Sequence, residues 1–164
     1  MNNRKHLTPS EVARLLGATQ QGKHAERDYC LIWMCFIHGC RVSEINRWRL
    51  SDIDLEGKSI YIHRLKNGLK VSRTSRGSDS DWLFLSEKGI HLSRQRIYWL
   101  MRHYSELAGL EVNAHPHMLR HGCGFALADR GIDTRLIQDF LGHKNIQHTV
   151  LYTASNARRF KEVW

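Results

Sequence analysis

Residues 115–143 read HPHMLRHGCGFALADRGIDTRLIQDFLGH and predict two helices in succession. Pro116 stands where a helix can begin, because the first turn does not need the N–H that proline lacks. Asp133 is a good N-cap for a second helix over 134–141. Gly142 then supplies a residue that can end this helix in the left-handed conformation.

One face of the first helix carries His117 and Arg120, because residues three apart lie on the same side of a helix. A permanently charged guanidinium beside a titratable imidazole suits the binding of phosphate. His121 lies about one residue further round the helix. Taken alone, a helix with surface histidines explains this motif equally well.

The N-terminal part of the chain also predicts helices. The stretch 8–11, TPSE, offers a capping threonine, a proline at the first helical position and a glutamate that closes a capping box. Residues 26–38 are apolar almost all round, which predicts a buried central helix, and Gly39 is expected to end it. A further helix is expected over 43–50 with Ser43 as its cap.

The middle of the chain changes from a helical to a strand period. Residues 59–63, SIYIH, alternate as a strand, and Asn-Gly at 67–68 predicts a tight turn. Residues 69–71 would then return antiparallel, with Lys66 at the mouth of this hairpin. A short apolar strand is expected at 82–85, WLFL.

The chain becomes helical again from Ser93, where four apolar residues recur at helical spacing: Ile97, Leu100, Met101 and Tyr104. Gly109 is expected to end this helix, and residues 149–164 predict one or two short final helices. The sequence therefore predicts a mainly α-helical fold with a small antiparallel β-sheet, which is an α+β class.

Charge and composition narrow the class of partner. The 164 residues include 25 Lys and Arg against 16 Asp and Glu, a formal net charge of +9. Such an excess favours a polyanionic partner, most often nucleic acid, although a merely soluble basic protein is the alternative. The sequence shows neither a membrane-spanning run nor a signal-peptide core, so an intracellular, cytoplasmic protein is expected.

The cysteines and histidines raise the question of a metal site. The four cysteines form no CxxC pair, and they are predicted to be reduced and structural: Cys30, Cys35, Cys40 and Cys123. Four possible zinc ligands fall within nine residues: His115, His117, His121 and Cys123. Their crowding does not match finger spacing, and a distant second pair is missing. No metal or other cofactor is expected.

An ordered set of six residues resembles the catalytic pattern of the tyrosine recombinase (phage integrase) family. The set is Arg41 in GCRVSE, Lys66, His117 and Arg120 in HMLRH, His143 in LGH, and Tyr152. The sequences of residues 115–143 and 148–160, the latter HTVLYTASNARRF, are more specifically similar to those of the fimbrial phase-variation recombinases, which invert a promoter-bearing DNA segment. The likeness runs from about Leu7 to the end of the chain.

The resemblance implies a mechanism. Arg41 and Arg120 would hold the scissile phosphodiester and neutralise charge as it develops. Tyr152 would attack phosphorus and form a 3′-phosphotyrosyl link. A phenol with a pKa of about 10 is ionised to only about one part in a thousand at neutral pH, so it needs a base or positive surroundings.

The remaining members of the set would handle protons. His117 is the expected base, Lys66 the expected acid for the departing 5′-oxygen, and His143 a hydrogen-bond donor to the phosphate. Because the bond energy is kept in the protein–DNA ester, neither a nucleotide nor a metal is required. The alternative is a catalytically inactive DNA-binding regulator derived from the same family.

The resemblance also carries expectations about organisation. Residues 1–164 would form a single catalytic domain without a separate N-terminal core-binding domain, and the chain looks shortened between about 67 and 81. The partner would be double-stranded DNA with inverted-repeat sites, near the nucleoid. Four copies would assemble on DNA, with the apolar end of the chain, 160–164, docking on a neighbour.

Overall fold

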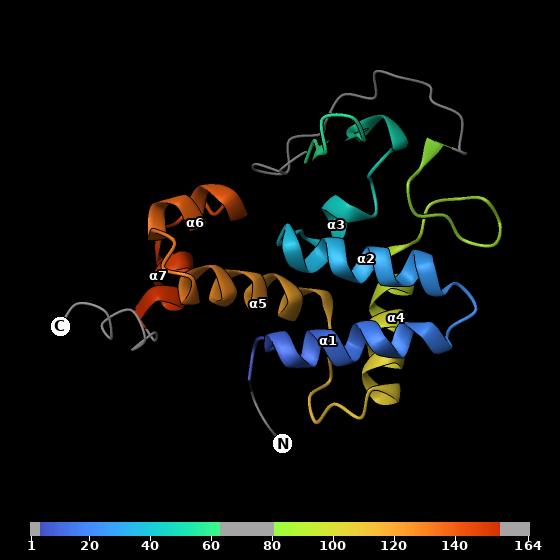
Figure 1. The fold of residues 1–164 in the computed structure, drawn as a ribbon, viewed down its shortest axis with the longest axis horizontal. Helices are drawn as coiled ribbons and strands as arrows, with labels where there is room; N and C mark the ends of the chain where they lie inside the picture. The colour runs from blue at the N-terminus through green and yellow to red at the C-terminus, as the bar shows by residue number, and fades with distance from the viewer. Residues whose placement is uncertain (1–3, 63–80, 155–164) are drawn as a thin grey trace.

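The computed structural model describes residues 4–62 and 81–154 (Figure 1). These ranges contain seven α-helices: α1 (Pro9–Ala18), α2 (Ala25–Ile37), α3 (Val42–Ile45), α4 (Arg94–Leu107), α5 (Pro116–Asp129), α6 (Thr134–Leu141) and α7 (Gln147–Ala154). They also contain the strands β1 (Ile53–Asp54) and β2 (Ser59–Ile60), and 3-10 turns at Thr19–Gln21 and Leu50–Asp52. The predicted class, mainly helical with a small antiparallel sheet, is confirmed.

The predicted capping box of α1 is confirmed. The backbone N–H of Glu11 donates to the Thr8 hydroxyl at 3.3 Å, and the N–H of Thr8 donates to the Glu11 carboxylate at 2.9 Å. Pro9 occupies the first turn, where no intrahelical N–H bond is needed. The start of the fold is therefore fixed by residues adjacent in sequence.

The helix α2 begins and ends close to its predicted limits, and Gly39 follows it with φ +56°. The prediction that it is buried all round is wrong. Leu31 and Ile32 are fully buried, whereas Tyr29 and Trp33 are each 40% exposed. The reason is that α2 packs against α1 and α5 on one side only, so its other apolar face stays at the surface.

The helix predicted over 43–50 with Ser43 as cap is wrong in both limits, because α3 ends at Ile45 and Arg41 is its cap. The Glu44 carboxylate accepts from the backbone N–H of Arg41 at 2.8 Å and sets this start. Beyond α3 the chain turns so that Trp48, 1% exposed, enters the core. Burial of this indole outweighs continuation of the helix.

The sheet is small. β1 pairs with β2 antiparallel, with Ile53 opposite Ile60 and Asp54 opposite Ser59. The strand predicted at 59–63 is thus confirmed at its first two residues. The predicted turn at 67–68, the returning strand at 69–71 and Lys66 lie outside the described residues.

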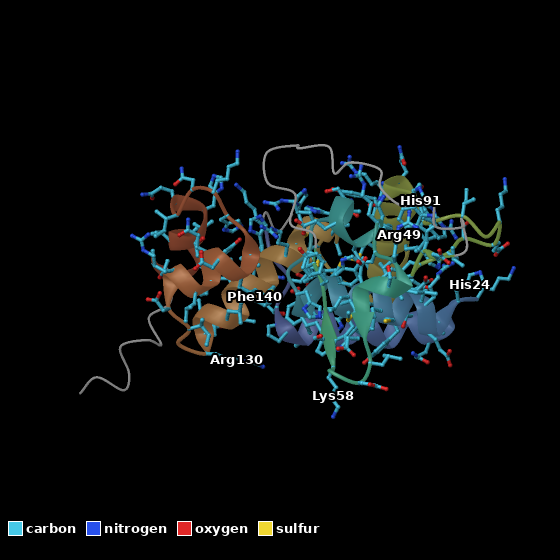
Figure 2. All side chains as sticks on the ribbon, turned by 90° about the horizontal axis from the view of Figure 1, so that it is seen from above. His24, Arg49, Lys58, His91, Arg130 and Phe140 are labelled. Carbon is cyan, nitrogen blue, oxygen red and sulfur yellow. The ribbon has the colours of Figure 1, made fainter. Side chains whose placement is uncertain are left out.

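The strand predicted at 82–85 is wrong, because this segment makes only isolated bridges, Arg49 with Trp82 and Leu85 with His91. Successive residues pair with different segments, so no continuous ladder forms. The Arg49 guanidinium lies 3.9 Å from the centre of the Trp82 ring, which is 5.1 Å from the His91 ring. Figure 2 shows Arg49 and His91 on the same side of the molecule.

The predicted limits of α4, α5 and α6 are confirmed, whereas α7 begins at Gln147, two residues before the predicted Thr149, and residues 155–164 of the predicted final helices lie outside the described residues. The Ser93 hydroxyl accepts from the Arg96 N–H at the start of α4, and α5 begins at Pro116. The Asp133 carboxylate accepts from the Arg135 N–H at 2.8 Å, and Gly142 ends α6 with φ +67°. Each of these limits depends on a local cap or on a glycine.

The buried apolar side chains form a larger and a smaller cluster. The larger cluster joins α1, α2, α4 and the first half of α5. The smaller cluster, called the C-terminal cluster below, lies at the far end of α5, where α6 and α7 pack: Cys123, Ala128, Ile137, Leu141 and Tyr152. The site described next includes Tyr152 of the C-terminal cluster.

The four cysteines are free thiols. Cys35, Cys40 and Cys123 are buried, which fits the structural role predicted for the cysteines, whereas Cys30 is exposed on α2 and does not fit it. Among the described residues, no helix is long and apolar enough to cross a membrane.

Candidate active site

The structure describes five of the six residues that the sequence predicts for the site. They come from four places in the fold: Arg41 at the start of α3, His117 and Arg120 on α5, His143 just after α6, and Tyr152 on α7. The sixth, Lys66, is not among the described residues.

Arg120 joins these places together. Its side chain is buried, with the residue 4% exposed, and its two terminal nitrogens donate to the Gly39 carbonyl at 2.5 Å and to the Leu141 carbonyl at 2.7 Å. Gly39 lies two residues before Arg41, and Leu141 lies two residues before His143. A single guanidinium on α5 thus holds the turn before α3 and the end of α6 next to each other.

Glu44 holds Arg41, and sequence reasoning gave this residue only a local role. The Glu44 carboxylate, whose side chain is fully buried, accepts from Nη1 of Arg41 at 2.9 Å as well as from its backbone N–H. The Arg41 side chain is 31% exposed, so the pair presents a partly open guanidinium from a buried anchor. Such a buried carboxylate restricts where the guanidinium can lie.

Burial lowers the pKa of both His117 and His143, and the positive charges of Arg120 and Arg41 lower both further. The pKa of His143 falls to about 4. Because both arginines act on both imidazoles, the four side chains share one positive environment. Both imidazoles are therefore neutral at pH 7, and Nδ1 of His143 lies 2.9 Å from the Thr149 hydroxyl.

Tyr152 lies beside this group but is fully buried, with the residue 0% exposed. Its hydroxyl lies 2.8 Å from Nδ1 of His121, and its ring centre lies 6.1 Å from that of His143. Burial raises the pKa of the phenol, whereas the charge of Arg120 lowers it. The structure therefore brings Tyr152 together with Arg120 and His143.

Sequence reasoning missed His121 as a partner of Tyr152. His121 lies four residues after His117 on α5, so both share one helix face, and this spacing was the available signal. Burial lowers the pKa of His121, and the nearby positive charge of Arg120 lowers it further. The imidazole is thus neutral near pH 7 and has an acceptor nitrogen.

The histidines of this region predict a pH dependence of stability. The folded protein lowers the pKa of five histidines below the unfolded value of about 6.5: His6, His115, His117, His121 and His143. The unfolded chain therefore binds more protons below that pH. The free energy of unfolding should fall as pH drops from about 6.5 towards 4.

Urea unfolding at a series of pH values measures this decline. Lowered carboxyl pKa values, such as that of Glu87, contribute only below about pH 4.5, so the upper part of the window reports the histidines. The variant His143→Asn, whose amide can still bond Thr149, should show a shallower decline. A midpoint that is constant between about pH 7 and 5 would contradict the assignment.

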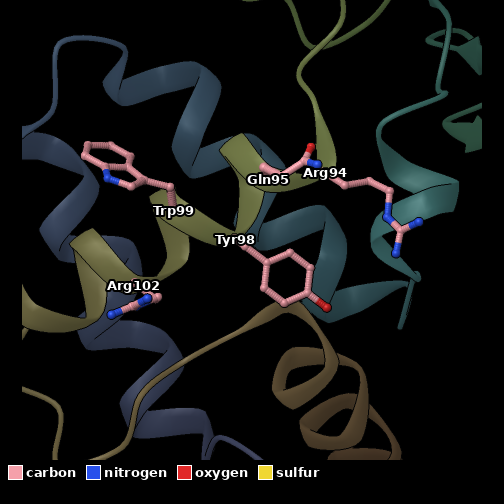
Figure 3. A pocket seen from close by; sticks show the side chains of 5 residues that line it. All are labelled: Arg94, Gln95, Tyr98, Trp99 and Arg102. Carbon is pink, nitrogen blue, oxygen red and sulfur yellow. The ribbon is translucent and has the colours of Figure 1, made fainter.

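A basic and aromatic face lies beside the site on α4. A shallow pocket there is lined by Arg94, Gln95, Tyr98, Trp99 and Arg102 (Figure 3). Trp99 is 49% exposed, and the Arg96 guanidinium lies 4.1 Å from the centre of its ring. The charge of Arg94 contributes to the lowered pKa of His117, so this face borders the site. Side chains of this kind suit a phosphate backbone.

A zinc site has no support among the residues that the structure describes, because they contain no group of three or more His, Cys, Asp or Glu placed to hold a metal ion. The His115 ring stacks on Tyr98 at 6.4 Å instead. His121 faces Tyr152, and Cys123 lies in the C-terminal cluster. Three of the four candidate ligands thus contact different neighbours.

Comparisons with known proteins agree on one family. The model of the phage integrase family matches residues 5–76 and 69–159. The chain is 54% identical over 179 residues to the type 1 fimbriae regulatory protein FimB of Escherichia coli K12, covering 98% of this chain and 90% of that protein. It is 44% identical over 183 residues to FimE of the same strain, covering 100% of this chain and 92% of that protein. The crystal structure of XerA recombinase matches with a TM-score of 0.78 and 26% identity, over 98% of this chain and 64% of that chain.

Proposed function

The chain belongs to the phage integrase family of tyrosine recombinases, and we propose that it is a site-specific recombinase that cleaves and rejoins DNA through a 3′-phosphotyrosyl intermediate. The observation that carries the proposal is the gathering of Arg41, Arg120, His143 and Tyr152 around the carbonyl contacts of Arg120. An inactive DNA-binding regulator is not favoured, because mere binding does not need this combination of side chains.

The reaction is a transfer of one phosphodiester bond. The Tyr152 oxygen attacks phosphorus, the bond from phosphorus to the 5′-oxygen breaks, and that oxygen takes up a proton. The same bond changes in reverse join a 5′-hydroxyl of the partner strand to phosphorus and release the phenol. The number of phosphoester bonds is unchanged at each step, so no nucleotide is consumed.

Arg41 and Arg120 neutralise charge on the phosphate oxygens in the transition state. A guanidinium carries five N–H donors in one plane, and the contacts to Gly39 and Leu141 fix the orientation of that plane for Arg120. Arg41 is fixed by Glu44 in the same way. Neutral His143 donates a hydrogen bond to the phosphate, since its Nδ1 is engaged with Thr149.

The proton transfers are assigned to His117 and Lys66. His117 is neutral beside both arginines, which suits an acceptor of the phenolic proton. Lys66 is assigned as the acid for the 5′-oxygen from the family pattern alone. Replacement of the bridging 5′-oxygen by sulfur gives a thiolate leaving group that needs no proton, so cleavage of such a substrate should not depend on this lysine, which gives a route to test it.

The biological reaction that we assign is inversion of a short DNA segment that controls fimbrial genes. The likeness to two type 1 fimbriae regulatory proteins over nearly the whole chain supports it. The substrate would be double-stranded DNA with inverted repeats, and the +9 charge and the α4 face support DNA as the partner. A protein acting on chromosomal DNA works in the cytoplasm, and association with the nucleoid is part of the same proposal.

The assembly and the domain plan are also proposals. Residues 1–164 would form a single catalytic domain that is shortened between about 67 and 81. The family model matches in two pieces that meet at 69–76, which supports the shortening. Four copies would assemble on two DNA sites, held together through the C-terminal segment. In a light-scattering titration with DNA, the molar mass of the complex should then rise in two steps, each the size of a protein dimer.

A nicked duplex carrying the recombination site tests the proposed chemistry. Cleavage next to the nick releases a short fragment, so religation fails and the covalent protein–DNA adduct accumulates. Mass spectrometry of the digested adduct should place the nucleotide on residues 145–158, the tryptic peptide that contains Tyr152. A chain that binds this duplex without forming any adduct would support the inactive regulator instead.

The α4 face predicts a change in the salt dependence of DNA binding. Arg102→Ala should remove one phosphate contact and reduce the slope of log K against log salt concentration by about 0.9. Fluorescence anisotropy with a labelled duplex at several salt concentrations measures this slope. Arg130→Ala is the matched control, since Arg130 is exposed at the end of α5, on the other side of the molecule (Figure 2). Equal slopes for both variants would contradict the assignment of α4 to the DNA interface.

A further inference from the structure

We propose that His121 is a positioning residue for Tyr152: its Nδ1 nitrogen accepts the hydrogen bond of the phenol and keeps the hydroxyl seated against α5 while no DNA is bound. This inference rests on the proposed function, in which Tyr152 is the nucleophile. It adds a residue outside the six-residue pattern and assigns it to the resting state of the site.

The direction of the hydrogen bond follows from what each group can do. The hydroxyl and Nδ1 are 2.8 Å apart, and among the described residues His121 is the one hydrogen-bond partner of the Tyr152 hydroxyl. A buried neutral phenol needs an acceptor for its proton. If the imidazole donated instead, the phenolic proton would be buried without an acceptor. The geometry thus favours the tautomer of His121 with its proton on Nε2.

The Tyr152 ring is closely packed in its position against α5. A Cβ placed on Gly124 would lie 2.5 Å from Cε2 of Tyr152, so the ring occupies space that only glycine leaves open on α5. Phe125 contacts the ring edge-on, with the ring centres 5.1 Å apart. Together with the 0% exposure of the residue, this means that a DNA phosphate cannot touch the hydroxyl in this conformation.

It follows that α7 must shift, or the Tyr152 side chain must swing, before the attack on phosphorus. His121 then sets how firmly the hydroxyl is held before that step. Its neutral state is favoured by burial and by the nearby positive charge of Arg120. His143, on the other side of the ring, is neutral as well and adds no charge that competes for the proton.

Nitration by tetranitromethane in the absence of DNA tests the proposal, because the reagent modifies accessible phenols. The tryptic peptides 145–158 and 59–64 contain one tyrosine each, Tyr152 and Tyr61, so the 67% exposed Tyr61 is an internal reference. Tyr152 should react far more slowly than Tyr61 in the parent chain. His121→Leu should raise the relative rate at Tyr152 about fivefold, the factor that corresponds to the loss of one ordinary hydrogen bond.

Rescue separates a hydrogen bond from a packing effect. In His121→Asn the amide oxygen can take the place of Nδ1, so the relative nitration rate should stay near that of the parent chain. His148→Leu, which alters an exposed imidazole on the same helix as Tyr152, should also leave the rate unchanged. Equal rates for the Leu and Asn variants, or no increase with Leu, would overturn the role of His121.

The result is independent of the proposed chemistry. Failure of the adduct assay would remove Tyr152 as nucleophile but would leave the nitration pattern intact. Conversely, a uniform nitration rate would remove the role of His121 but would leave adduct formation intact.

Discussion

Tyr152→Phe is expected to abolish the covalent protein–DNA adduct, with a loss of at least about 10³-fold in the rate of strand cleavage. The substitution removes the attacking oxygen and keeps the ring that fills the seat beside Gly124. The fold should therefore survive, with a loss of about 1 kcal/mol in the free energy of unfolding from the broken bond to His121. A denaturing gel with the nicked duplex measures the adduct, and urea unfolding measures the stability.

Tyr98→Phe is the matched control, because it removes a phenolic oxygen from the neighbouring α4 face. This variant should form adduct at a rate close to that of the parent chain. Adduct formation by Tyr152→Phe at the parent rate would show that another residue is the nucleophile. DNA binding by both variants should be retained, since neither change removes a positive charge.

Arg120→Ala is expected to abolish cleavage and also to lower the free energy of unfolding by about 3–5 kcal/mol. The stability effect arises because two carbonyls, of Gly39 and Leu141, lose charged donors at once, and a bond to a charged group contributes about 1.5–3 kcal/mol. Arg120→Lys should restore little of this, because one ammonium cannot reproduce the planar fork of the guanidinium.

Arg102→Ala serves as the control for stability, because Arg102 is exposed on α4 and its loss should change the free energy of unfolding by less than about 0.5 kcal/mol. Urea denaturation of the variants at pH 7 provides the comparison. If Arg120→Ala were as stable as Arg102→Ala, the two carbonyl contacts would not hold the loops together, and Arg120 would act on the phosphate alone.

Helix limits that depend on neighbouring residues could be predicted from the sequence. The cap at Asp133, the end at Gly142 and the capping box of Thr8 with Glu11 involve only groups within a few residues of each other. The end of α3 could not be predicted in this way. It depends on the burial of Trp48, which is a property of the whole core.

The site shows the same division. The residue types of the site and their order could be predicted from the sequence, because a phosphoryl transfer needs guanidiniums, imidazoles and a phenol. The way in which these side chains are held together could not be predicted, since it depends on Arg120 reaching carbonyls 81 and 21 residues away in the sequence. The contact of His121 with Tyr152 spans 31 residues and likewise needs the fold. Whether these residues carry out the assigned steps stays a prediction for the variants above.

The C-terminal cluster has a consequence for the energetics of this protein. Within the part of the chain that the structure describes, it contains five buried residues, and Tyr152 is the bulkiest of them. When the Tyr152 ring leaves this position to attack the phosphate, a cavity opens beneath α7 and the local packing becomes less stable. Amide hydrogen exchange should thus be fastest to respond in α6 and α7 when cognate DNA is added. Tyr152 fills the C-terminal cluster and is also the proposed nucleophile. Binding of the DNA duplex and loosening of this cluster should therefore be coupled in one equilibrium.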